Sequence, residues 1–186
     1  METGENKVKS ILKEILNTSI YLLIVICIAY LIVTYVGQRT RVSGGSMEST
    51  LSSEDHLLVD KISYRFNAPE RFDIIVFPFQ YDEELYYIKR IIGMPGETIR
   101  IDTEGNIYIN DEILEEDYGR EVIENPGRAI EPITLGDDEY FVMGDNRNNS
   151  SDSRDPSVGN IHRDDIIGKA FIRIWPLSKF GILKHQ

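Results

Sequence analysis

Cysteine and histidine are scarce in this sequence of 186 residues. The only cysteine is Cys27, so no disulfide can form within one chain, and a domain outside the cell would have to fold on packing alone. The three histidines, His56, His162 and His185, are far apart and form neither an HExxH motif nor the Cys/His spacing of a zinc site. The sequence gives no support to metal catalysis, and we expect no metal and no cofactor.

Positively charged residues are also few in comparison with acidic ones. The chain has 20 lysines and arginines against 31 acidic residues, and its formal net charge is −11. Residues 1–37 hold equal numbers of lysines and acidic residues, so the negative excess belongs to the remainder of the chain. Such a surface repels the phosphates of nucleic acids. We therefore expect no nucleic-acid partner.

Long apolar runs are absent except for one, residues 15–37, which contain no charged side chain. As a helix this run would be roughly 34 Å long, enough to cross a hydrocarbon core of about 30 Å. A cleaved signal peptide is the alternative, but its apolar core is normally about 7–15 residues and is followed by a cleavage site of small residues. We therefore predict a retained anchor, with membrane lipid among the partners.

The charges beside the anchor predict its orientation. Three lysines precede it and two arginines follow it, namely Lys7, Lys9, Lys13, Arg39 and Arg41. Segments rich in Lys and Arg tend to stay in the cytoplasm. We predict a cytoplasmic tail over residues 1–14, a single-pass anchor in the cell membrane over 15–37, and an extracytoplasmic domain over 38–186, which has the size of one soluble domain.

Beyond the anchor, the periodicity is that of short β-strands. Runs rich in Ile, Val, Tyr and Phe predict strands at residues 56–63, 73–79, 86–92, 98–101, 106–109, 140–143 and 169–175. Residues 103–105, Thr-Glu-Gly, indicate a hairpin turn. Residues 114–136 are acidic and contain glycine and proline, so we expect a solvated excursion there. The predicted fold class is mainly β: one N-terminal transmembrane helix, then an antiparallel, barrel-like sheet domain.

Residues with special chemistry gather in three strings, of which two predict reactive groups. In residues 43–51, two glycines precede Ser46, and such glycines leave backbone amides open to a substrate, as an oxyanion site requires. In residues 87–97, Lys89 lies in a strand between apolar neighbours, where loss of hydration lowers the pKa of a lysine and can make it a general base. Taken singly, each string favours a plainer interpretation: a Gly-Ser linker after a membrane helix, and a lysine at a strand edge whose charged end lies in water.

The third string, residues 144–154, is dense in Asp, Asn and Ser, which hydrogen-bond nearby backbone and fix loops. An EF-type calcium loop that started at Asp145 would have Arg147 and Pro156 at positions where oxygen ligands belong. The calcium template therefore fails. Taken alone, this string predicts a structural polar loop.

Together and in this order, behind one membrane segment, the strings resemble the signatures of the type I signal peptidase family. The members of this family are membrane-bound Ser/Lys proteases. The string Gly45-Ser46-Met47-x-x-Thr50-Leu51 is similar to the family's nucleophile box. The string Tyr87-Ile88-Lys89-Arg90, followed by Gly93-x-Pro95-Gly96-Glu97, is similar to its general-base box. Residues 144–154 resemble its third signature and residues 55–61 an intervening strand motif. The resemblance covers nearly the whole chain.

This resemblance implies a serine endopeptidase that removes N-terminal signal peptides from secretory preproteins at the outer membrane surface. It implies Ser46 as the nucleophile and, through its backbone amide, as part of the oxyanion hole, with Lys89 as the base. The implied supporting residues are Ser150, which would hydrogen-bond and orient the lysine, and Asp145, Asp152 and Arg154. The implied substrate contacts are Val42, Met47, Leu51, Tyr87 and Ile88.

The resemblance also implies preproteins with small residues at positions −1 and −3, often Ala-x-Ala, and an encounter with the secretion translocon. Two positions depart from the family pattern. Gly44 lacks the hydroxyl that some members add to the oxyanion hole, and Ser49 replaces a proline that would stiffen the turn.

Three other functions stay open at this point. The first is a self-cleaving repressor-type Ser/Lys protease, but such a protein would carry a DNA-binding region in place of a membrane helix. The second is a weakly active or non-catalytic membrane-anchored β domain that binds a protein partner, with residues 44–51 as its linker. The third is a metal hydrolase, which would be sensitive to chelators.

Overall fold

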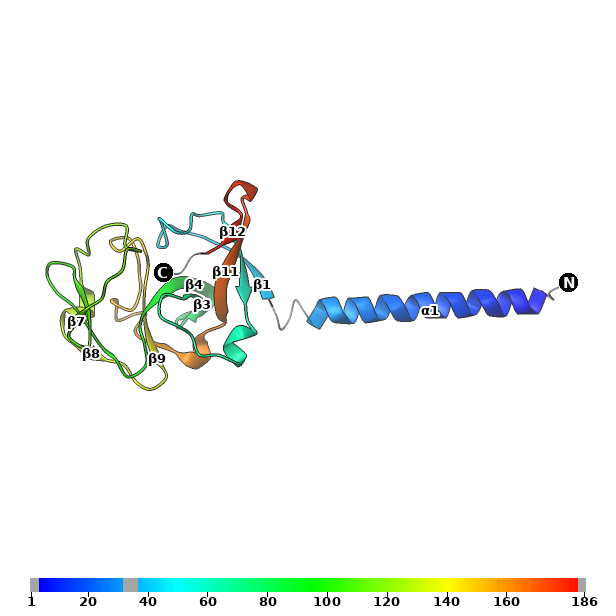
Figure 1. Ribbon diagram of the computed structural model, residues 1–186, viewed down its shortest axis with the longest axis horizontal. Helices are drawn as coiled ribbons and strands as arrows, with labels where there is room; N and C mark the ends of the chain where they lie inside the picture. The colour runs from blue at the N-terminus through cyan, green and yellow to red at the C-terminus, as the bar shows by residue number, and fades with distance from the viewer. Residues whose placement is uncertain (1–3, 32–36, 184–186) are drawn as a thin grey trace. The chain divides into compact units, whose positions relative to one another are not determined.

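The computed structural model describes residues 4–31 and 37–183 of the chain. The chain folds as two compact units, Met1–Gly37 and Gln38–Gln186. The first unit contains a single described helix, α1, and the second contains the β-strands (Figure 1).

Helix α1 runs from Gly4 to Leu31. Its part Lys7–Leu31 is the one described segment long and apolar enough to cross a membrane. The helix extends back through part of the predicted tail, because residues 5–31 contain no glycine or proline that would end it. Residues 32–36 of the predicted anchor lie outside the described residues, and Gly37 belongs to the first strand.

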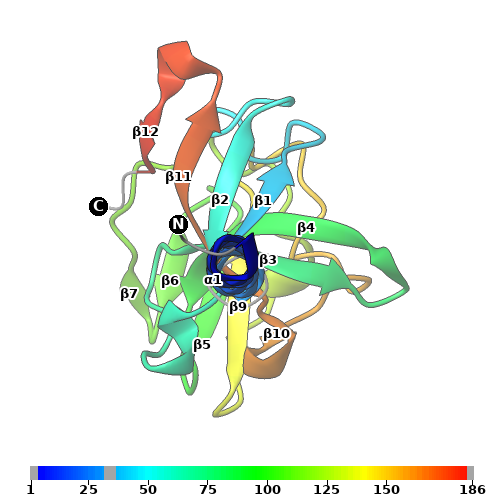
Figure 2. The ribbon, with the colours of Figure 1, turned by 90° about the vertical axis from the view of Figure 1, so that its right-hand side faces the viewer.

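The second unit consists of two sheets (Figure 2). The larger has eight strands, in the order β1 (Gly37–Arg41), β2 (His56–Asp60), β11 (Gly168–Trp175), β3 (Ile74–Phe79), β4 (Asp82–Gly93), β9 (Glu139–Met143) and β10 (Ile161–His162), with β12 (Gly181–Ile182) beside β11. The smaller has four, in the order β7 (Glu112–Ile113), β6 (Ile107–Ile109), β5 (Thr98–Ile101) and β8 (Ile133–Thr134). All the ladders described among strands β2 through β12 are antiparallel. The predicted mainly β, antiparallel fold with one N-terminal apolar helix is confirmed.

Each strand predicted from the periodicity is present, and one of them is shortened by more than a single residue. The strand that begins at His56 ends at Asp60 and not at Ser63. The reason is a side-chain cap, since the Asp60 Oδ1 accepts hydrogen bonds from the amides of Ile62 and Ser63 at 2.8 and 3.0 Å and turns the chain into the short 3₁₀ helix Ser63–Arg65. The sequence analysis missed β1, which has no large apolar residue, and the two-residue strands β7, β8, β10 and β12, which are too short to show a period.

The excursion over residues 114–136 is only partly solvated. Glu115, Asp117, Glu121 and Glu124 are exposed, as expected. However, the segment also buries Ile123, Ala129 and Leu135 in a core cluster with the smaller sheet. A second cluster packs Val42, Met47 and Leu51 against Leu57, Ile74, Ala170 and Leu183. This second cluster anchors the turn that carries Ser46.

Candidate active site

Ser46 and Lys89 meet although 43 positions separate them in the sequence. Lys89 Nζ lies 2.8 Å from Ser46 Oγ. Ser46 lies in the turn after β1, which is closed by hydrogen bonds from the Thr50 and Leu51 amides to the Met47 carbonyl at 2.8 and 2.7 Å. The flanking Met47 and Leu51 are 2% and 1% exposed and hold this turn in the core. The turn also contains a cis peptide bond, between Glu48 and Ser49.

Strand β4 places Lys89 in a nearly dry environment. Its side chain is only 4% exposed, and its strand neighbour in β3 is the fully buried Ile75. Burial lowers the pKa of Lys89 to about 8, although Asp152 and Asp145 oppose this shift. Nζ also donates to the Ile88 carbonyl at 3.2 Å and lies 4.9 Å from the centre of the Tyr87 ring. At pH 7 roughly a tenth of such a lysine is neutral and able to accept a proton.

Behind the dyad, a buried ion pair fixes the chain segments that carry it. Arg90, the residue after Lys89, is 0% exposed and donates through Nε and Nη2 to the two carboxylate oxygens of Asp145 at 2.8 and 2.7 Å. Thr50 Oγ1 donates to the same carboxylate. This bidentate pair joins β4, the nucleophile turn and the loop after β9. Asp145, which the resemblance implied as a supporting residue, thus lies where it can support the site.

Asp152 and Arg154 form a second buried pair within the same loop. Arg154 Nε and Nη2 contact the Asp152 carboxylate oxygens at 2.8 and 2.9 Å, and the Gly144 amide donates to Asp152 Oδ2 at 3.0 Å. A Cβ at Gly144 would fall on Ser150 Oγ and on the Ser46 carbonyl oxygen. Only glycine therefore allows the loop to approach the nucleophile so closely.

The structure does not contain the expected hydrogen bond between Ser150 and Lys89. Ser150 Oγ is buried and has no partner among the described residues, whereas Lys89 Nζ bonds Ser46 Oγ and the Ile88 carbonyl. The hydrogen bonds of the lysine amine are thus made to atoms other than Ser150 Oγ. Ser150 is nevertheless near the nucleophile, since both its hydroxyl and the Ser46 carbonyl border Gly144.

Asn146 is a site residue that the sequence analysis missed. It is 6% exposed, its amide nitrogen donates to the Ser46 carbonyl at 3.0 Å, and its Nδ2 donates to the Gly45 carbonyl at 3.0 Å. The Ser46 amide itself donates no hydrogen bond within the described chain. The oxyanion role that the resemblance implied for this amide stays a prediction.

A cavity of about 390 Å³ opens beside the dyad. Four of the predicted substrate contacts line it, namely Val42, Met47, Tyr87 and Ile88, together with Ser46 and Lys89. Leu51 does not, because its side chain points into the core, so the prediction of a direct substrate contact for this residue needs correction. Residues that the sequence analysis missed also line the cavity, among them Ser43, Leu85, Tyr86 and Ser151.

Comparison with known proteins decides the family. The sequence matches the family described as "Signal peptidase, peptidase S26" over residues 15–175. It is 40% identical over 155 residues to a probable signal peptidase I-2 of Synechocystis sp., covering 81% of this chain and 68% of that protein. It is 41% identical over 157 residues to a signal peptidase I of Leptolyngbya laminosa, covering 81% and 74%. The chain belongs to the signal peptidase family.

Membership of the signal peptidase family makes the chain a hydrolase, a serine endopeptidase, and implies substrates that carry a signal peptide. Together with the apolar helix α1, it also indicates anchoring in a membrane. A crystal structure of a signal peptidase I from Enterococcus faecalis V583 matches 55% of this chain and 97% of that chain, with 32% identity and a TM-score of 0.44.

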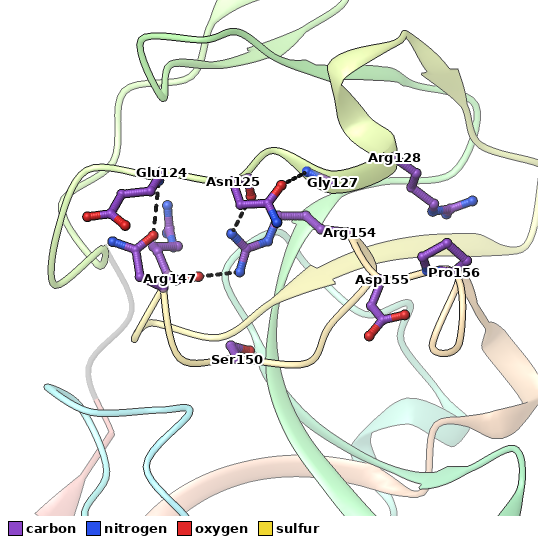
Figure 3. A pocket seen from close by; sticks show the side chains of 10 residues that line it. Glu124, Asn125, Gly127, Arg128, Arg147, Ser150, Arg154, Asp155 and Pro156 are labelled. Carbon is purple, nitrogen blue, oxygen red and sulfur yellow. Dashed lines mark hydrogen bonds between the residues drawn. The ribbon is translucent and has the colours of Figure 1, made fainter.

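A second cavity, about 530 Å³, lies on the loop after β9 (Figure 3). Arginines and acidic residues both line it, including Arg128, Arg147, Arg154, Glu124 and Asp155. Arg147 and Arg154 already pair with Glu116 and Asp152. Neither Ser46 nor Lys89 is among its lining residues, whereas both line the cavity of about 390 Å³.

Proposed function

We propose that the chain is a type I signal peptidase that removes N-terminal signal peptides from secretory preproteins with a Ser46/Lys89 dyad. One observation carries the proposal: the nearly buried Lys89 amine lies 2.8 Å from the Ser46 hydroxyl. The burial that lowers the pKa of the lysine makes it a base, and the contact gives it a proton to remove. No histidine is needed in such a pair.

The acylation step follows from this geometry. Neutral Lys89 accepts the proton of Ser46 as Oγ attacks the carbonyl carbon of the scissile peptide. The carbonyl oxygen becomes an oxyanion, for which the unbonded Ser46 amide is a donor. The C–N bond then breaks, the Lys89 ammonium returns its proton to the leaving amine, and the signal peptide remains as an ester on Ser46.

Deacylation uses the same base. Lys89 takes a proton from a water molecule, the resulting hydroxide attacks the ester carbonyl, and Ser46 leaves with the proton that the lysine returns. The buried pairs Arg90–Asp145 and Arg154–Asp152 hold Ser46 and Lys89 in position, and these charged residues take no part in bond making.

Substrate binding by strand addition is supported by the pairing of β4. Residues 82–90 of β4 pair with β3, but β9 pairs with β4 only from Arg90 onward. The second edge of β4 around Ile88 is therefore unpaired in the described ladders, and it lines the cavity together with residues 40–44. An extended signal-peptide segment can bind there through its main chain, with small side chains at −1 and −3 in the cavity.

The proposal includes the orientation of the chain in the membrane. The apolar run that begins at residue 15 spans the cell membrane, residues 1–14 remain in the cytoplasm, and residues 38–186 form the catalytic domain outside. The eight residues from Gln38 to Gly45 extend at most about 30 Å, so Ser46 works close to the bilayer, where preproteins leave the translocon. Three lysines before the anchor against two arginines after it favour this orientation.

Cleavage of a preprotein tests this function and its specificity. The detergent-solubilised full chain is expected to cut a preprotein with alanine at −1 and −3 directly after the −1 residue, as mapped by mass spectrometry of the product. The same preprotein with leucine at −1 should be cut about 100-fold more slowly, because the larger side chain does not fit. Equal rates on both preproteins, or cuts at scattered positions, would contradict the proposed specificity, and absence of any cut would favour a binding domain.

A further inference from the structure

We infer that Asn146 is a positioning residue that aims the oxyanion-binding amide of Ser46. The inference rests on the proposed function, because it concerns the same reaction. Asn146 lies in the loop after β9 and contacts the nucleophile turn twice: its backbone amide donates to the Ser46 carbonyl and its Nδ2 to the Gly45 carbonyl, both at 3.0 Å. The acceptor at Gly45 is a carbonyl, so the side-chain atom facing it must be the amide nitrogen.

Peptide geometry links this contact to the oxyanion hole. The Gly45 carbonyl and the Ser46 N–H belong to one planar trans peptide, in which the two groups point in opposite directions. A donor that holds the carbonyl therefore fixes the direction of the N–H. Because the Ser46 amide has no acceptor within the described chain, no hydrogen bond from the amide itself restrains this direction.

The peptide needs such a restraint because glycines precede it. Gly44 has φ of +91°, and Gly45 has no Cβ that would resist rotation about its own backbone bonds. The other bond that the Gly45 carbonyl accepts comes from the Glu48 amide at a longer 3.2 Å. Bonds to the carbonyl also polarise the peptide and make its N–H a better donor. Asn146 is 6% exposed, so water has poor access to replace it.

The test compares Asn146→Asp and Asn146→Ala with the control Asn149→Asp, an exposed asparagine of the same loop. We expect kcat for the preprotein to fall about 10- to 100-fold in both Asn146 variants, with KM within about twofold of that of the unmodified chain. The reason is that an oxyanion hole stabilises the transition state and not the bound substrate. The control variant should match the unmodified chain.

A pair of inhibitors provides a readout that loss of structure would not move. Ser46 Oγ adds to the carbon of a peptide aldehyde, its proton passes to Lys89, and the aldehyde oxygen becomes an oxyanion. The matched peptide alcohol binds in the same cavity without forming this adduct. Both ligands bind only folded protein, so the ratio of their affinities is independent of the folded fraction.

We expect this ratio to fall in the Asn146 variants by the same factor as kcat/KM, while affinity for the alcohol stays unchanged. Unchanged kcat, or equal weakening of aldehyde and alcohol, would overturn the inference. The proposed function fails separately, if Ser46→Ala still cuts the preprotein or still prefers the aldehyde.

Discussion

Replacing Ser46 with alanine is expected to lower kcat for preprotein cleavage by at least about a thousandfold. The substitution removes the hydroxyl oxygen placed 2.8 Å from the buried lysine, so no acyl-enzyme can form. The fold should be unaffected, because Ser46 lies in a turn that is held by Met47 and Leu51. Initial rates on a preprotein with an Ala-x-Ala site, measured at saturating substrate, check this prediction.

Ser53→Ala is the matched control, since Ser53 is an exposed serine in the same connection between β1 and β2 and does not line the cavity. It should cut at the rate of the unmodified chain. Cleavage by Ser46→Ala at more than a few per cent of that rate would mean that another residue is the nucleophile.

Replacing Lys89 with methionine is expected to be as damaging, with kcat again lowered about a thousandfold or more. Methionine fills much of the same buried space in β4 but cannot accept a proton. Lys89→Arg should also be inactive, because a guanidinium stays protonated at any working pH. Rates on the same preprotein, with folding verified by circular dichroism, make the comparison.

Lys179→Met serves as the control for loss of a lysine, since Lys179 is exposed and lies in the connection between β11 and β12. The double variant Ser46→Ala, Lys89→Met should be no slower than either single variant, because the two residues act as one unit. If the double variant lost activity by the product of the two single losses, the two residues would act independently, and this would contradict the proposal that they work as a dyad.

The sequence pointed to Ser46 and Lys89 through the pattern around each residue and through the order of the motifs. Period two places Lys89 on one face of a strand with apolar neighbours, and the glycines before Ser46 mark an unusual turn. The order of the boxes behind the apolar run then indicated the family, which the comparisons confirmed. Most of the longer strands were predictable for the same reason, since their apolar residues recur with period two, whereas β1 was missed because its five residues, Gly37–Arg41, include no large apolar side chain.

Other parts of the site depend on tertiary contacts that leave no sequence pattern. Asn146 acts through bonds to main-chain carbonyls at Gly45 and Ser46, which are about a hundred positions away. The open edge of β4, which exposes Leu85 and Tyr86 to the cavity, exists because β9 pairs only with the end of that strand. Neither feature changes the composition or period of its own segment.

The two corrections have the same origin. Leu51 belongs to the nucleophile box, but burial of the turn directs it into the core cluster and away from the cavity. Ser150 lies near the nucleophile, yet the contacts of Lys89 Nζ are with Ser46 and Ile88. Position within a motif places a residue near the site but does not determine where its side chain points.

The pH dependence of kcat/KM for the unmodified chain tests the central claim, that a neutral Lys89 is the general base. Burial lowers the pKa of this lysine from 10.5 to about 8, and only the deprotonated amine accepts the serine proton. Activity should therefore rise about tenfold per pH unit below pH 8 and level off above it. A rise centred near 10.5, a flat profile, or a fall through pH 8 would contradict the account.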